Sequence, residues 1–167
     1  MSGLDNIGTA LPRRTARQPG GMPPPRSLPP SLAGNPALPY PQIGQELAEL
    51  RVQIPGVHGC VLGGVDGLMI THNLQTDIDP SDLAALAATT YGLGRQVGLR
   101  LGQGDFQQST VRNALGYLSV YAVSAQALLA VVGGDTINVA RLHLHAPQVA
   151  ERLAVLLDGV TPTSRQR

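Results

Sequence analysis

Residues 79–101 read DPSDLAALAATTYGLGRQVGLRL, and both the ends and the internal spacing of this segment predict one long helix. Asp79 is of a residue type that caps helix N-termini, and Pro80 suits the first helical position because it needs no N–H there. At 1.5 Å per residue the helix would run about 35 Å, which is longer than an average helix. We therefore expect the rest of the fold to be organised around it.

The apolar residues divide this helix into two faces when its residues are placed at 100° intervals. An apolar stripe fit to lie on a sheet is formed by Leu83, Leu86, Ala87, Thr90, Leu93, Val97 and Leu101. A second face is formed by Ala84, Ala88, Tyr91, Arg95 and Leu99, and the small residues Gly92, Gly94 and Gly98 add to it. Small residues let another backbone approach closely, so the second face predicts a partner. A helix buried in the core of a monomer is the alternative that the pattern leaves open.

Composition narrows the class of protein. The 167 residues are enough for one domain with additional segments, and all twelve basic residues are Arg. The single cysteine, Cys60, excludes an intramolecular disulfide framework and predicts a reducing cytoplasm. No stretch is apolar enough to predict insertion in a membrane. Residues 43–160 hold six Arg against ten acidic residues, and the chain has one Phe and no Trp, which argues against nucleic-acid binding.

Proline content predicts the domain boundaries. Residues 1–42 hold ten of the fourteen prolines, which predicts a disordered, partly polyproline-II arm. Within it, PPPRSLPP (residues 23–30) suits either a proline-reading groove or a solvated tether. The folded domain is expected over residues 43–160, followed by a flexible tail over residues 161–167.

The folded part begins with two kinds of local signal. Apolar residues at 43, 47, 50 and 54 follow helical spacing, and Pro55-Gly56 ends that helix. Two apolar runs, residues 57–65 and 68–72, then flank Asp66-Gly67. An Asp-Gly pair between such runs predicts a hairpin with a two-residue type I′ turn.

After the long helix the pattern returns to strands and ends in a helix. Residues 106–113 are polar and predict an edge strand, followed by a strand over residues 117–124. The unbroken apolar run at residues 127–132 predicts a central strand covered on both faces. Residues 136–157 predict a final helix in which Pro147 is either a kink or the start of a second half. A strand over residues 137–145 is the competing interpretation.

This order of elements resembles the roadblock family of dynein-light-chain and GTPase-regulator domains. Three stretches carry the likeness, which extends over about residues 43–158: PGVHGCVLGGVDGLMITH (55–72), SDLAALAATTYGLGRQVG (81–98) and ALLAVVGGDTINVARLHLHAPQVAERL (127–153). The Arg-only, Ala/Gly-rich composition resembles actinobacterial members that are encoded beside small Ras-like GTPases. Pro147 and the proline-rich arm depart from the family pattern.

The resemblance implies a profilin-like α+β fold. Its five-stranded antiparallel sheet carries the long helix on one face and the terminal helices on the other, in the order α-ββ-α-βββ-α. It also implies a homodimer in which the long helices pack antiparallel and the third strands meet edge to edge. The interface residues that follow are Ala84, Ala88, Tyr91, Arg95, Leu99, Gln107, Ser109, Val111 and Asn113.

The resemblance further implies a non-enzymatic regulator or scaffold of a Ras-like small GTPase in bacterial signalling. Arg95 and Arg100 are the expected GTPase contacts, with plain solvated side chains as the alternative reading. A sensor kinase or other signalling protein encoded nearby is a further possible partner. The alternative function is a profilin-like sensory module that binds a small ligand.

The sequence shows no motif for chemistry of its own. GGVDG (residues 63–67) and GQGD (residues 102–105) lack the Gly-Lys-Ser/Thr of a phosphate-binding loop, and no serine stands in a nucleophile motif. Zinc would need four ligands, which the sequence does not supply as a motif. We expect no cofactor, no metal and an inert, buried Cys60.

Overall fold

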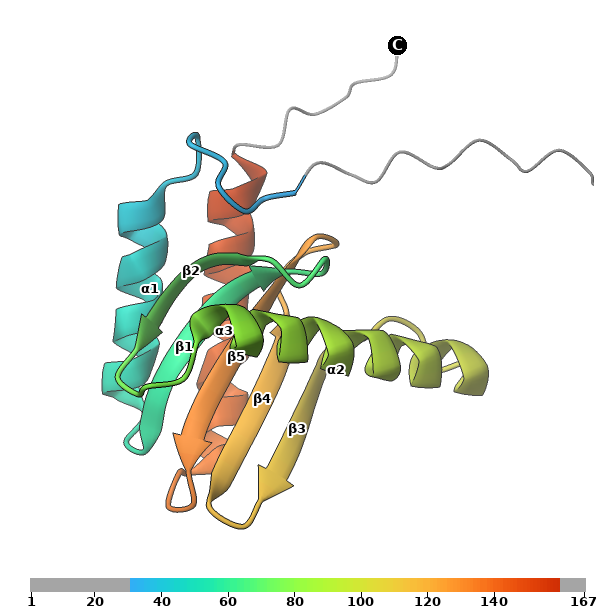
Figure 1. Ribbon diagram of the computed structural model, residues 1–167. Helices are drawn as coiled ribbons and strands as arrows, with labels where there is room; N and C mark the ends of the chain where they lie inside the picture. The colour runs from blue at the N-terminus through green and yellow to red at the C-terminus, as the bar shows by residue number, and fades with distance from the viewer. Residues whose placement is uncertain (1–30, 160–167) are drawn as a thin grey trace, which may run out of the picture.

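A five-stranded antiparallel sheet separates two layers of helix (Figure 1). The structure, a computed structural model, describes residues 31–159. Its elements are α1 (Tyr40–Gln53), β1 (Val57–Gly64), β2 (Met69–Leu74), α2 (Pro80–Leu101), β3 (Gln108–Asn113), β4 (Gly116–Ala122), β5 (Ala127–Gly134) and α3 (Val139–Asp158). The strand order is β2-β1-β5-β4-β3. The predicted α+β architecture and the order α-ββ-α-βββ-α are confirmed.

The central strand shows why its sequence is apolar throughout. Leu129 and Val131 of β5 belong to the core shared with α1 and α3, whereas Leu128 and Ala130 belong to the core under α2. Successive side chains of a strand point to opposite faces, so a strand covered on both faces must be apolar at every position. The predicted central position of this strand is confirmed.

The hairpin between β1 and β2 is confirmed, but its predicted two-residue turn is wrong. The Gly67 N–H donates to Gly64 C=O at 3.0 Å and the Gly64 N–H donates to Leu68 C=O at 2.8 Å. Residues 65–67 therefore form a three-residue loop, with Gly67 at a φ of 84°. The Asp66 carboxylate accepts the Leu68 N–H at 3.1 Å and holds the loop closed.

The final helix is confirmed, and the competing strand over residues 137–145 is wrong. Asn138 caps α3 by accepting the Arg141 N–H at 2.9 Å, and the helix runs through Pro147 as one element. Its buried residues recur at helical spacing and pack on the sheet beside α1: Leu142, Ala146, Val149, Ala150, Leu153 and Leu157. This burial offsets the backbone hydrogen bond that Pro147 cannot make.

The ordered domain begins earlier than the predicted residue 43. Helix α1 starts at Tyr40, and Leu32 and Leu38 are 7% and 4% exposed within the core of α1 and α3. Prolines at a helix start remove no hydrogen bond, because the first N–H groups have no partner inside the helix. Their density near Tyr40 therefore marks a helix entry and not a disordered segment. Residues 1–30, with the PPPRSLPP stretch, and residues 160–167 lie outside the described part of the chain.

The largest difference from the sequence prediction concerns the faces of α2. Its capping is as predicted, since Asp79 accepts the Ser81 N–H at 2.8 Å. Leu83 and Ala87 also face the sheet, but so do Ala84, Ala88 and Tyr91, which had been assigned to a partner. The remaining large residues of the predicted sheet stripe are exposed, namely Leu86 (55%), Leu93 (69%), Val97 (44%) and Leu101 (65%).

The small residues lie against the sheet because helix and sheet approach closely there. A Cβ placed on Gly63 of β1 would lie 3.1 Å from the Ala84 Cβ, so a larger residue at either position would push α2 away. The predicted division of α2 into faces is therefore wrong, and Ala84 is a core residue of its own chain.

The early start of the domain generates a prediction on stability. Leu38→Ala should lower the free energy of unfolding by about 2–4 kcal/mol, because it opens a cavity in the α1–α3 core. Val52→Ala, at a side chain that is 76% exposed, is the matched control and should change it by about 0.5 kcal/mol or less. Denaturant unfolding followed by circular dichroism measures both. Equal effects of the two substitutions would place Leu38 outside the core.

Candidate functional site

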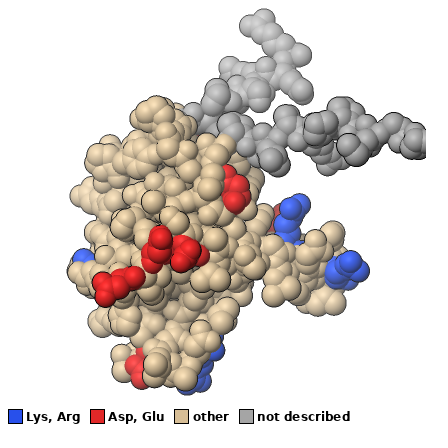
Figure 2. All heavy atoms as spheres, viewed as in Figure 1, with Lys and Arg blue, Asp and Glu red and all other residues tan. Residues whose placement is uncertain are grey.

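The second half of α2 carries large apolar side chains that are exposed to solvent. Leu83, Ala84 and Ala87, in the first two turns, hold the helix on the sheet, whereas Figure 1 shows the C-terminal half extending beyond β3. Figure 2 shows basic side chains on this projecting end, with most of the acidic side chains in the view on the rest of the domain. Exposed apolar residues gathered on one face mark an interaction surface.

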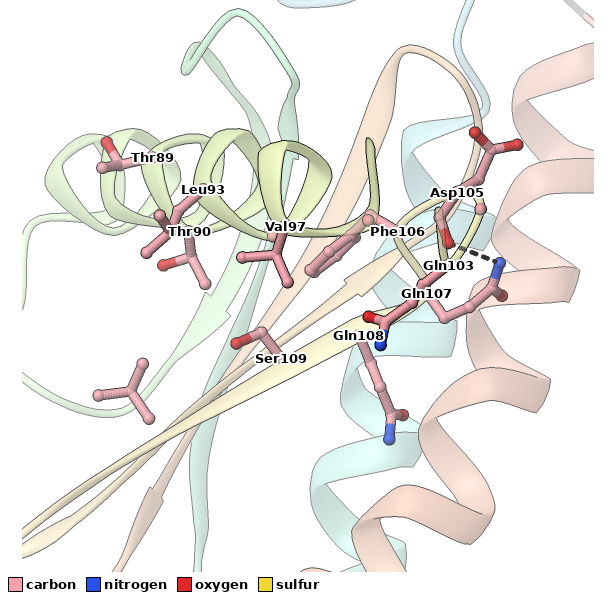
Figure 3. A pocket seen from close by; sticks show the side chains of 14 residues that line it. Thr89, Thr90, Leu93, Val97, Gln103, Asp105, Phe106, Gln107, Gln108 and Ser109 are labelled. Carbon is pink, nitrogen blue, oxygen red and sulfur yellow. Dashed lines mark hydrogen bonds between the residues drawn. The ribbon is translucent and has the colours of Figure 1, made fainter. Parts of the chain in front are cut away.

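A groove runs between this half of α2 and strand β3, with a volume of about 530 Å³. Figure 3 shows Thr90 and Val97 pointing from the helix toward the strand that carries Ser109. The side chains that line the groove are Thr89, Thr90, Leu93, Val97, Gln103, Asp105, Phe106, Gln107, Gln108, Ser109 and Val111. We name this surface the α2/β3 groove.

Phe106 closes one end of the α2/β3 groove and depends on glycine for its place. Its ring packs edge-on against Tyr91, with centroids 5.4 Å apart and an interplanar angle of 87°. A Cβ on Gly94 would overlap the Phe106 ring, and a Cβ on Gly98 would overlap the Gly104 carbonyl. These glycines therefore serve packing within the chain, whereas the sequence had suggested that they admit a partner helix.

Strand β3 forms the open side of the sheet. It pairs with β4, and no described strand pairs with its other edge. Val111 is 41% exposed, and Gln107, Arg112 and Asn113 are also exposed. The prediction of an edge strand is confirmed. Unpaired N–H and C=O groups on such an edge are a template for pairing with another chain.

A partly buried polar ring ties β3 to its own chain on the opposite face. Thr110 Oγ1 lies 2.9 Å from Ser119 Oγ and 3.3 Å from His143 Nε2, and the Tyr121 hydroxyl lies 2.9 Å from His143 Nδ1. Burial raises the pKa of Tyr121 to about 12, so its hydroxyl keeps its proton, and Ser119 hydrogen-bonds to it. Each hydroxyl can donate to one neighbour and accept from another, and the imidazole can donate from either ring nitrogen, so the four side chains can satisfy one another. This ring fixes β3 against β4 and α3 although its outer edge is unpaired.

The predicted interface residues fall into three groups. Ala84, Ala88 and Tyr91 pack on the sheet, as described above. Gln107, Ser109 and Val111 line the α2/β3 groove, with Asn113 exposed further along β3. Arg95 and Leu99 are exposed but do not line it, and Arg95 instead borders a hollow with Asp105 and Ser124.

Sequence reasoning missed the helical half of the groove. The residues concerned are Thr89, Thr90, Leu93 and Val97, three of which had been assigned to the sheet. The sequence did contain a signal for this half of the groove, because the large apolar residues of α2 lie on a different line along the helix from its alanines. Which line faces the sheet depends on packing against strand residues that are remote in the sequence, Gly63 among them.

The free cysteine and the potential metal ligands among the described residues do not gather into one site. Cys60 is fully buried, and burial raises the pKa of its thiol to about 12, so the prediction of an inert core cysteine is confirmed. His58, two residues away, is exposed, so the two side chains do not share a site. Within residues 31–159 no three His, Cys, Asp or Glu side chains are grouped to hold a metal ion. The same residues contain no helix that is long and apolar enough to cross a membrane.

Comparison with known proteins identifies the family. The sequence model of the Roadblock/LC7 domain matches residues 43–133, which is more than half of the chain. The chain belongs to the Roadblock/LC7 domain family, as its resemblance had implied.

Solved structures agree with this assignment. The Roadblock/LC7 domain from Streptomyces avermitilis is 27% identical, with a TM-score of 0.64 over 68% of this chain and 95% of that one. The gliding protein MglB from Thermus thermophilus is 23% identical, with a TM-score of 0.69 over 80% of this chain and 100% of that one. A structure of MglB in a tetrameric arrangement is 24% identical, with a TM-score of 0.71 over 79% of this chain and 98% of that one. The two MglB structures show a shared fold.

Proposed function

We propose that this protein is a homodimeric, non-enzymatic regulator or scaffold of a Ras-like small GTPase. The observation that carries the dimer is the α2/β3 groove, where an exposed apolar helix face lies beside an open sheet edge. A second copy turned about a two-fold axis would cover both features at once, helix against helix and β3 against β3. The tetrameric arrangement of MglB supports self-association for this fold.

The energetic case for the dimer rests on three side chains. Leu86, Leu93 and Val97 are 55%, 69% and 44% exposed, and a Leu or Val side chain gains about 1.5–3 kcal/mol when it moves fully from water to an apolar contact. A symmetric interface buries each of them twice. Pairing of the β3 edges adds main-chain hydrogen bonds in fixed register. Such an interface needs no ligand or cofactor to form.

The choice of a GTPase as partner rests on membership of the family and on its resemblance to GTPase-regulator domains. Residues 43–160 carry a net charge of −4, which suits a basic patch on a partner and would act mainly on the association rate. Arg95 remains the proposed contact, since it is exposed on the projecting half of α2 and does not line the α2/β3 groove. Arg100 is also exposed there, but it lies on the line of the helix that a second copy would cover. A location in the cytoplasm and an actinobacterial source remain predictions.

The sensory alternative has weaker support. Binding pockets for small molecules usually enclose most of the ligand surface. The α2/β3 groove lies open along a helix and a strand edge, and its lining includes exposed glutamines. We therefore assign the groove to a protein partner.

The dimer can be tested with two leucines of the same helix. Leu93→Arg should weaken self-association by about 2–4 kcal/mol, because it places a charge in the apolar contact. Leu99→Arg is the matched control, since Leu99 is 74% exposed, as Leu93 is 69% exposed, but lies off the groove. Sedimentation equilibrium measures both dissociation constants. A loss of the dimer with Leu99→Arg alone would move the interface to the face first predicted from sequence.

The partner can be tested by titration. The wild-type dimer should bind a Ras-like GTPase from the same genome in at least one of its GTP-loaded and GDP-loaded states, as measured by calorimetry. Arg95→Ala should reduce that affinity while leaving the dimer intact, because Arg95 lies outside the groove. Parallel hydrolysis assays separate a regulator, which changes the rate, from a scaffold, which does not. Absence of binding in both nucleotide states would contradict the GTPase proposal.

A further inference from the structure

The exposed stripe of α2 has a charge of opposite sign at each end. Asp82 and Arg100 are both exposed and stand eighteen residues apart, which is five full turns of an α-helix and about 27 Å. They therefore lie on one line along the helix surface. Leu86, Leu93 and Val97 lie between them, within about 60° of that line at 100° per residue.

The residues of this stripe are placed nearly symmetrically about the middle of the helix. Asp82 and Arg100 have residue 91 as their midpoint, and so do Thr89 and Leu93. The midpoint of Leu86 and Val97 falls between residues 91 and 92. Two copies of the helix in antiparallel contact about this point would set each Asp82 against Arg100 of the other copy. Leu93 would lie against Thr89, and Leu86 would lie near Val97.

Neither charge forms an ion pair within the described part of its own chain. Among residues 31–159 the ion pair that the structure shows is Arg152 Nε with Glu46 Oε2, at 2.7 Å between α3 and α1. Asp82 and Arg100 stand where acidic and basic residues also favour an isolated helix through its dipole. If the two charges acted only on the helix dipole, they would not affect which chains pair with each other. Measuring which chains pair therefore distinguishes the two roles.

We propose that Asp82 and Arg100 set the register and the pairing specificity of the homodimer. This inference rests on the dimer proposed above and adds its alignment. A parallel pair, or an antiparallel pair shifted by a turn, would leave the charges unpaired or bring like charges together. Antiparallel contact about residue 91 joins two Asp82–Arg100 pairs at once, and the two-fold symmetry makes both pairs equivalent.

Charge reversal gives the test. Asp82→Arg alone would set Arg against Arg at both ends, and Arg100→Asp alone would set Asp against Asp. Each single variant should dimerise about tenfold more weakly than the wild type by sedimentation equilibrium, since two attractive contacts become repulsive. The double variant D82R/R100D restores opposite charges and should return to within about threefold of the wild type. In about 1 M salt, where the Debye length is about 3 Å, the differences should shrink.

Mixing the two single variants makes the test sharper. Their heterodimer sets the introduced arginine of one chain against the introduced aspartate of the other, and it keeps one native pair of Arg100 with Asp82. Native mass spectrometry should therefore find the heterodimer well above the roughly one-half expected of random pairing. Helix dipole effects act within each chain and cannot produce this preference. Arg95→Asp is the control, because Arg95 lies about 140° from the line of Arg100 and should leave the dissociation constant unchanged.

The outcomes separate this inference from the dimer itself. A wild-type dimer whose single variants associate normally, or whose variants mix at random, would overturn the charge register and leave the dimer standing. A wild-type protein that is monomeric at all concentrations would overturn both. If one single variant folds poorly, the deciding measurement is the other single variant compared with the double variant, because recovery in the double variant requires that the two charges pair.

Discussion

The close approach of α2 to the sheet is the constraint on which the interaction surface depends. Gly63 of β1 leaves room for Ala84, and this contact requires the alanine line of the helix to face inward. Because the alanines face the sheet, the other apolar line of the helix is exposed to solvent. That line consists of Leu86, Leu93 and Val97. A small residue on a strand thus contributes to which face of α2, a helix remote from it in the sequence, is available to a partner. Substituting either residue would alter the packing and the surface together.

The two faces of the sheet have different structural roles. On the face toward α1 and α3, a large apolar core and the polar ring around His143 fix the strands in place. On the other face a smaller core holds the first half of α2 and leaves the large apolar residues of its second half exposed. The rigid layer therefore presents an open β3 edge beside an exposed helix face. Protein binding needs such a preorganised surface, because ordering it on contact would cost entropy.

Much of the fold could be predicted from local pattern. The apolar run at residues 127–132 predicted the central strand, because a strand buried on both faces is apolar throughout. The polar stretch at residues 106–113 predicted the edge strand, because an edge is exposed to water. The strand half of the α2/β3 groove followed from this edge strand together with the resemblance to the roadblock family, which implies that third strands meet edge to edge. The helical half did not, since amphipathic spacing shows that α2 has two lines but not which one the sheet accepts. The domain start was also missed, because prolines near Tyr40 suit a helix entry as well as a disordered arm.

The central claim is that a second copy of this chain covers β3 and the exposed line of α2. Hydrogen–deuterium exchange at two protein concentrations, one below and one above the dissociation constant, tests this most directly. The account predicts that the amides of β3, Gln108–Asn113, exchange more slowly at the higher concentration, while those of β2, Met69–Leu74, at the opposite edge of the sheet, are unchanged. Slower exchange in β2 with no change in β3, or no dependence on concentration over a range in which the protein dimerises, would contradict it.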